Sequence, residues 1–160
     1  MSAPRLEVDL DKIQHNARTL VTRLAKRGIS VTAVMKACLG SAEIADTLLR
    51  AGVSMIGDSR MENIEAMRRA GVKAPMMLIR SPMISDVQRV VRYADVSLNS
   101  EIDVIVQLSL AAKAAGRRHG VVLMVELGDL REGIMPDDLE QTVGLLLDLP
   151  NIDLKGSVPT

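Results

Sequence analysis

Short runs of apolar and β-branched residues alternate along this chain with longer segments of helical periodicity. Most runs are apolar on both faces, which is typical of parallel strands that are covered on both sides. Because a helical segment separates one run from the next, the pattern predicts six consecutive strand–helix units. The predicted strands are residues 30–36, 53–58, 75–80, 95–99, 120–127 and 151–156.

The first helical segment, residues 11–28, shows the pattern on which the helix predictions depend. Ile13, Ala17, Leu20 and Leu24 recur at helical spacing and define its apolar face. Several later helix starts carry a serine, followed three residues later by a side chain that can complete a capping box. The predicted boxes pair Ser59 with Glu62, Ser85 with Gln88, and Ser100 with Asp103.

Two architectures accommodate consecutive strand–helix units. An open doubly wound sheet of six strands would be complete at this length, whereas a (β/α)8 TIM-type barrel would be covered only in part, with about six of its units in this chain. The periodicity alone fits both. The chain contains no linker-like or low-complexity stretch, so we expect one α/β domain or a piece of one.

Polar side chains stand at or just after the C-terminal ends of the predicted strands. In both architectures these ends lie on one rim, where ligand sites form. The sequence therefore predicts a site on this rim, although a polar residue at such a position also suits a helix cap or an exposed surface charge. The candidates are Lys36, Asp58, Arg60, Arg80, Asn99 and Arg131.

Lys36 is the one charged residue of the first predicted strand and lies at its C-terminal end. A lysine amine in a partly apolar setting is favoured in its neutral form, because burial disfavours the ammonium ion. Such an amine can form a Schiff base with a sugar-like substrate or with pyridoxal phosphate. The alternative is a side chain that simply extends from the strand end to solvent, and the spacing leaves both interpretations open.

Composition narrows the classes of partner and cofactor. The chain carries 20 basic and 20 acidic residues, has a formal net charge of zero and contains one aromatic residue, Tyr93, so we expect no nucleic-acid partner. No apolar run is long enough to cross a bilayer, and the N-terminus lacks the layout of a signal peptide. With a single cysteine, Cys38, and two distant histidines, we expect a cytoplasmic protein without a membrane partner or a metal.

Five short motifs follow one another along nearly the whole chain, from about Arg5 to Gly156. They read LEVDLDKIQHNARTL, AVMKA, GDSRMENI, SLNSE and LGDLREGI. Taken in this order, the motifs resemble the N-terminal barrel domain of the alanine racemase family, and they are most similar to its ornithine-racemase-like branch. The resemblance favours the (β/α)8 TIM-type barrel over the open sheet.

The resemblance also implies an activity, which is that of an amino-acid racemase, an isomerase that depends on pyridoxal 5'-phosphate. Lys36 stands at the position of the family lysine that holds the cofactor as a Schiff base and moves a proton at the substrate Cα. Arg131 matches the family arginine near the substrate carboxylate and the cofactor's phenolic oxygen. From its neighbours alone, Arg131 could instead pair with Asp129 or Glu132. The expected partner is a small amino-acid substrate.

Two departures from the family pattern carry further expectations. Residues 37–40 read Ala-Cys-Leu-Gly and lack the asparagine and tyrosine that follow the lysine in alanine racemases, which favours the ornithine-like branch. The family continues into further barrel strands, which carry the phosphate loops, and into a C-terminal β-domain. We therefore expect residues 1–160 to form a partial cofactor-binding barrel domain that is inactive alone and belongs to a homodimer when full length. Arg80 and Asn99 are expected to shape its substrate pocket.

Two other functions fit the same sequence. One is a non-catalytic pyridoxal-phosphate-binding homeostasis protein of the single-domain barrel type. The other is an α/β binding module without a cofactor, in which Lys36 only extends to solvent.

Overall fold

The computed structural model describes residues 4–160 and contains one sheet of six parallel strands in the order β1-β2-β3-β4-β5-β6. Each strand therefore lies beside the strand that precedes it in the chain. A doubly wound sheet reverses its strand order, so this topology is that of a (β/α)8 barrel wall. The strands are β1 (Thr32–Val34), β2 (Met55–Asp58), β3 (Met76–Leu78), β4 (Val96–Asn99), β5 (His119–Val125) and β6 (Ile152–Pro159).

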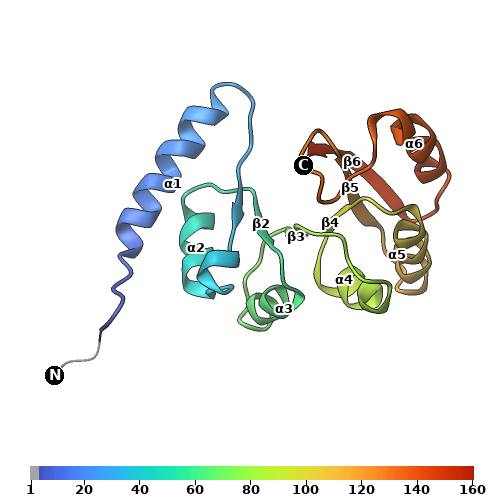
Figure 1. Ribbon diagram of the computed structural model, residues 1–160. Helices are drawn as coiled ribbons and strands as arrows, with labels where there is room; N and C mark the ends of the chain where they lie inside the picture. Colours follow the sequence, from blue (N-terminus) through green and yellow to red (C-terminus); the bar gives the residue numbers. More distant parts are fainter. Residues whose placement is uncertain (1–3) are drawn as a thin grey trace.

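Helices and strands alternate along the chain, which begins with a helix among the described residues. Figure 1 shows the strands along a curved arc, with α3, α4 and α5 on its convex side. Within residues 4–160, no helix is both long and apolar enough to cross a membrane. The α-helices are α1 (Leu10–Ala25), α2 (Ala42–Arg50), α3 (Met61–Arg69), α4 (Val87–Tyr93), α5 (Ile102–Ala114) and α6 (Leu139–Leu147), and the short 3-10 helices are η1 (Lys36–Cys38), η2 (Ile84–Asp86) and η3 (Pro136–Asp138).

The hydrophobic core lies between the strands and the helices. Ile56 and Met76 are opposite each other in the β2–β3 register, and both are fully buried. Ile64 of α3, Val90 of α4 and Ile105 of α5 belong to the same buried cluster. Burial of these side chains removes apolar surface from water, which stabilises the packing of the helices on the wall.

The first five strands are shorter than the apolar runs that predicted them, whereas β6 continues past its predicted end at residue 156 to Pro159. The first strand ends at Val34, so Lys36 does not end the strand but begins the 3-10 helix η1. The chain leaves the ladder at Met35, whose N–H donates to the carbonyl of Gly57 at 2.8 Å. Apolar residues beyond the ladder are still buried, as Met35 is, and this is why the apolar run overestimated the strand.

The predicted capping boxes are wrong. Helix α3 begins after Arg60, α4 after Asp86 and α5 after Glu101, and none of these N-cap residues forms a side-chain cap. The hydroxyl of Ser100 instead lies 3.1 Å from that of Ser81, in the loop after β3. The apolar face predicted for α1 is also covered only in part, because the side chain of Leu20 is 55% exposed.

Candidate active site

A hollow of about 410 Å³ opens at the C-terminal rim of the strands, among the segments that follow β1, β2, β3 and β5. Three of the side chains predicted from the sequence line it together. The topology brings them to one place because parallel strands end on the same rim. The lining residues are Lys36, Ser59, Ile79, Arg80, Ser81, Arg131 and Glu132.

Lys36 lies on a turn whose backbone is held on both sides. After the Met35 N–H has bonded to β2, the Cys38 N–H donates back to the Met35 carbonyl at 2.9 Å. Gly40 then adopts a φ of +66°, and a Cβ there would come within 2.8 Å of the Cβ of Asn63 in α3. A side chain at this position would clash with α3, so the close approach requires glycine, and the turn fixes where the backbone of Lys36 leaves the wall.

The Lys36 side chain itself is exposed. The described part of the chain therefore does not supply the partly apolar enclosure that one of the two interpretations of Lys36 requires, and the exposure agrees with the other, a side chain that extends to solvent. The exposure does leave the amine accessible to a carbonyl compound that enters the hollow.

Asp58 does not line the hollow, but it holds together two segments next to it. Its side chain is fully buried at the end of β2. The backbone N–H of Arg60 donates to its Oδ1 at 2.9 Å, and the Nδ2 of Asn63 lies 3.1 Å from both carboxylate oxygens. These donors satisfy the buried charge and join β2 to the start of α3, against which the turn after Lys36 packs.

Arg131 lies on a tight loop after β5. The Glu126 carboxylate accepts backbone N–H groups of Leu130 and Gly128, which lower its pKa from the usual value and organise the loop. The Arg131 Nε lies 3.2 Å from the Asp129 Oδ2. The ion pair that the sequence analysis gave as an alternative is thus present, and Arg131 nevertheless lines the hollow beside Lys36.

Arg80 and Asn99 were both predicted to shape the pocket, and the structure separates them. Arg80 lies two residues after β3 and lines both the main hollow and a smaller neighbouring hollow of about 110 Å³. Asn99 is fully buried at the end of β4, and its Nδ2 donates to the carbonyl and the hydroxyl of Ser97, both at 3.0 Å. Among the residues described, Asn99 is not part of the lining, and its Oδ1 has no hydrogen-bond partner.

His119 adjoins the Asn99 network. It begins β5, at the end of the wall opposite the hollow, as expected from its place before the predicted strand. Its Nε2 lies 2.9 Å from the Ser97 hydroxyl, and the side chain is 1% exposed. Burial, together with the charge of Arg117, lowers the pKa of His119 to about 4, so the ring is neutral at neutral pH.

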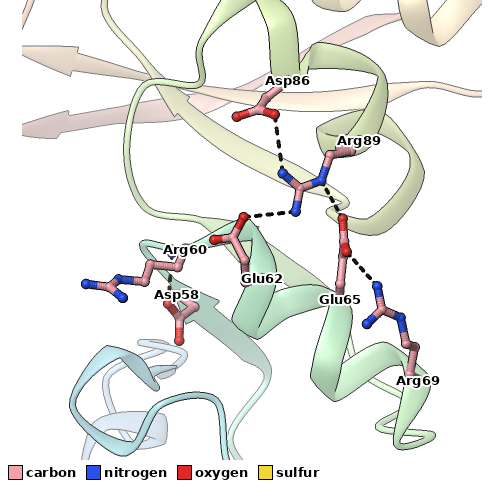
Figure 2. Close-up of polar contacts among 7 residues, drawn as sticks. All are labelled: Asp58, Arg60, Glu62, Glu65, Arg69, Asp86 and Arg89. Carbon is pink, nitrogen blue, oxygen red and sulfur yellow. Dashed lines mark hydrogen bonds and ion pairs between the residues drawn. The ribbon is translucent and has the colours of Figure 1, made fainter.

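A cluster of ion pairs, shown in Figure 2, fastens α4 to α3 beside the smaller hollow. Arg89 of α4 bonds Glu65 through Nε at 2.6 Å, Glu62 through Nη2 at 3.0 Å and Asp86 through Nη1 at 3.3 Å. The bond to Glu65 is the main cause of the raised pKa of Arg89. Arg69 also pairs with Glu65, at 2.8 Å. The sequence analysis missed this cluster, because its partners come from different helices.

The lining of the hollow suits a particular kind of ligand. The lysine amine can react with a carbonyl group, two guanidinium groups can bind anionic oxygens, and two serine hydroxyls can donate or accept hydrogen bonds. A compound that combines an aldehyde with phosphate and phenolate oxygens matches this set. The donor set therefore fits pyridoxal phosphate, with Lys36, Arg80 and Arg131 as the residues that would hold it.

The strand order and the hollow at the rim define a parallel (β/α) barrel wall with a lysine among the residues that line its C-terminal rim. Residues 8–158 match the family described as alanine racemase, N-terminal domain. The chain belongs to this family, which confirms the resemblance of the sequence motifs and the partial TIM-type barrel.

Two relatives carry diamino acids in their names. The chain is 36% identical over 154 residues to an ornithine racemase of Acetoanaerobium sticklandii, a match that covers 96% of this chain and 43% of that protein. It is 37% identical over 134 residues to a lysine racemase of Thermotoga maritima, covering 84% of this chain and 38% of that protein. The chain thus spans about two fifths of the length of these relatives.

Solved structures share the fold. An alanine racemase of Clostridium difficile 630 superposes with a TM-score of 0.83 at 18% identity, covering 92% of this chain and 42% of that one. A D-threonine aldolase from Filomicrobium marinum gives a TM-score of 0.86 at 19% identity, covering 98% of this chain and 43% of that one. At such identities the likeness concerns the fold alone.

Proposed function

We propose that the protein is the barrel part of an amino-acid racemase that uses pyridoxal 5'-phosphate. The observation that carries this proposal is the convergence of Lys36, Arg80 and Arg131 on one hollow at the C-terminal rim. The names of the relatives support racemisation as the reaction. The chemistry of the lining supports the cofactor.

Lys36 has two tasks in this proposal. Its amine would hold the carbonyl carbon of the cofactor, and the same amine is the group of this chain that would move a proton at the substrate Cα. Pyridoxal phosphate, when bound, withdraws electrons and so stabilises the negative charge that develops at Cα. The turn at Gly40 keeps the backbone of Lys36 at the rim, and this preorganisation reduces the entropy lost when the amine and Cα meet.

Arg131 and Arg80 bind anionic groups. A guanidinium stays charged and offers paired donors to a carboxylate, so Arg131 orients the α-carboxylate of the substrate or the phenolic oxygen of the cofactor. The ion pair with Asp129 leaves its Nη groups as further donors. Arg80, between the two hollows, contributes a second positive charge, and the hydroxyls of Ser59 and Ser81 lie beside it.

We infer that residues 1–160 are a partial barrel domain and that further strands, a C-terminal β-domain and a second subunit complete the site. Two observations support this inference. Among the described strands, β1 pairs only with β2, and β6 only with β5, so the barrel wall is open on both sides. The relatives are also more than twice as long as the matched region. On this proposal the whole protein is a cytoplasmic homodimer.

The test is reductive trapping of the lysine. The protein is incubated with pyridoxal phosphate and reduced with borohydride, and the modified peptide is mapped by mass spectrometry. A single adduct on Lys36 that is lost in K36A and kept in K113A, whose site is an exposed lysine of α5, is the expected result. Labelling that is equal in K36A, or spread over the surface lysines, would contradict the proposal. It would favour a binding module without the cofactor.

A further inference from the structure

Glu132 is the one carboxylate among the described residues that line the hollow. The other charged lining residues, Lys36, Arg80 and Arg131, are all basic. Glu132 is half-buried, and within residues 4–160 its side chain forms no ion pair, whereas Arg131 pairs with Asp129. Its charge is thus available to a ligand in the hollow.

The backbone of Glu132 is fixed. The hydroxyl of Thr160 donates to its carbonyl oxygen at 2.6 Å. The next residue, Gly133, has a φ of +144°, and a Cβ there would come within 2.6 Å of the Glu126 nitrogen. The Ile134 N–H then bonds to the Met124 carbonyl at 2.8 Å, which returns the chain to β5. The backbone is therefore held on the C-terminal side of Glu132, whose side chain lines the hollow.

A carboxylate at this place disfavours most amino acids. The substrate's α-carboxylate and the cofactor's oxygens carry negative charge, so Glu132 repels them while the three basic residues attract them. Its charge favours a substrate that carries a cation away from Cα. A terminal ammonium group meets this need, since it has three N–H donors and forms charge-assisted hydrogen bonds with a carboxylate.

We propose that Glu132 is a specificity-determining residue that binds the distal ammonium group of a diamino acid, such as ornithine or lysine. This inference rests on the proposed function and names its substrate class. The names of the two relatives agree with it. Arg131 and Lys36 engage the α-carbon end of such a substrate, and Glu132 engages the other end. An apolar amino acid leaves the carboxylate without a partner, which costs binding free energy.

The test compares ornithine with norvaline, which has the same carbon chain but no terminal amine. Exchange of the Cα proton for deuterium is measured by NMR with the cofactor-loaded whole protein, for wild type, E132Q and E140Q. We expect E132Q to lower kcat/KM for ornithine by about 10- to 100-fold, the value of a charge-assisted hydrogen bond. For norvaline kcat/KM should not fall and should rise if the unpartnered carboxylate of wild type costs binding free energy, so the preference for ornithine is lost. E140Q alters an exposed glutamate of α6 and should match wild type.

Equilibrium binding of the two amino acids to the same variants separates this inference from the proposed function. If wild type exchanges neither amino acid, the proposed racemase activity fails. The ratio of the two dissociation constants, in wild type and in E132Q, then still decides the role of Glu132. The inference is overturned if E132Q loses kcat/KM or affinity equally for both amino acids. It is also overturned if wild type prefers ornithine neither in exchange nor in binding.

Discussion

The hydroxyl of Thr160 donates a 2.6 Å hydrogen bond to the carbonyl oxygen of Glu132, and so joins the residue that follows β6 to the loop that carries Arg131. The end of β6 and the loop after β5, which carries two lining residues of the hollow, are thereby linked through one side chain. The backbone around Thr160 adds to this link, because its N–H donates to the Val125 carbonyl of β5 at 3.0 Å.

Replacing Thr160 with valine removes the hydroxyl and keeps the branched shape. We expect T160V to lower the free energy of unfolding by about 1 kcal/mol, since the Glu132 carbonyl loses its donor. Proteolytic cleavage within residues 128–133 should also become faster. Urea unfolding and limited proteolysis measure both effects. T22V, at an exposed threonine of α1, is the control, and equal behaviour of the two variants would refute the link.

Gly133 cannot be replaced without strain. A Cβ in its left-handed conformation meets the Glu126 nitrogen at 2.6 Å and the Thr160 Oγ1 at 2.9 Å. We expect G133A to destabilise the protein by about 2 kcal/mol, measured by urea unfolding. G144A is the matched control, because this glycine lies within α6 and a Cβ there meets nothing within 4 Å. That variant should be neutral or slightly more stable, as alanine is the better helix former.

His119 makes stability depend on pH. Its pKa is about 4 in the folded protein and 6.5 in the unfolded chain, so the unfolded state binds more protons between these values. The stabilisation is complete above pH 6.5 and is lost as the pH falls toward 4, by up to about 3 kcal/mol. Unfolding free energies at pH 4.5 and 7 should differ less in H119Q than in wild type. H15Q, at an exposed histidine, should keep the wild-type slope.

Arg89 of α4 binds three carboxylates, and two of them, Glu62 and Glu65, belong to α3. In R89A, Glu65, whose side chain is 11% exposed, keeps only its pair with Arg69. We expect a loss of about 1–2 kcal/mol in unfolding free energy, smaller at high salt because the outer pairs are screened. Urea unfolding at two salt concentrations measures this. R18A removes an exposed arginine of α1, and a loss as large in R18A would show that the cluster contributes little.

The order of strands and helices could be predicted from the sequence because it depends on periodicity, which is local. The convergence of Lys36 and Arg131 followed from one topological rule, that parallel strands end on one rim. The sequence did not show how exposed Lys36 is, since exposure depends on what surrounds the rim. Nor did it choose between the two environments of Arg131, because the guanidinium lines the hollow and pairs with Asp129 at once.

Other features depend on contacts between distant residues and left no local signal. Arg89 and Glu65 are 24 positions apart and meet only because α3 and α4 pack side by side. The capping prediction failed at α3 for a related reason. Asp58, one residue before Ser59, is buried at the strand end, and its carboxylate takes the N–H of Arg60. A serine–glutamate spacing does not show that α3 begins one residue later, after Arg60, whose N–H is held by the aspartate.

The short β1 strand, with three residues and β2 as its one partner among the described strands, has a consequence for the dynamics of the site. Local opening requires the least free energy where few hydrogen bonds and few buried contacts must be broken. The amides around Lys36 should therefore exchange with solvent deuterium sooner than those of β4 and β5, which sit deep in the ladder. A ligand held by both Lys36 and Arg131 would slow that exchange, so amide protection near Lys36 reports the assembly of the site.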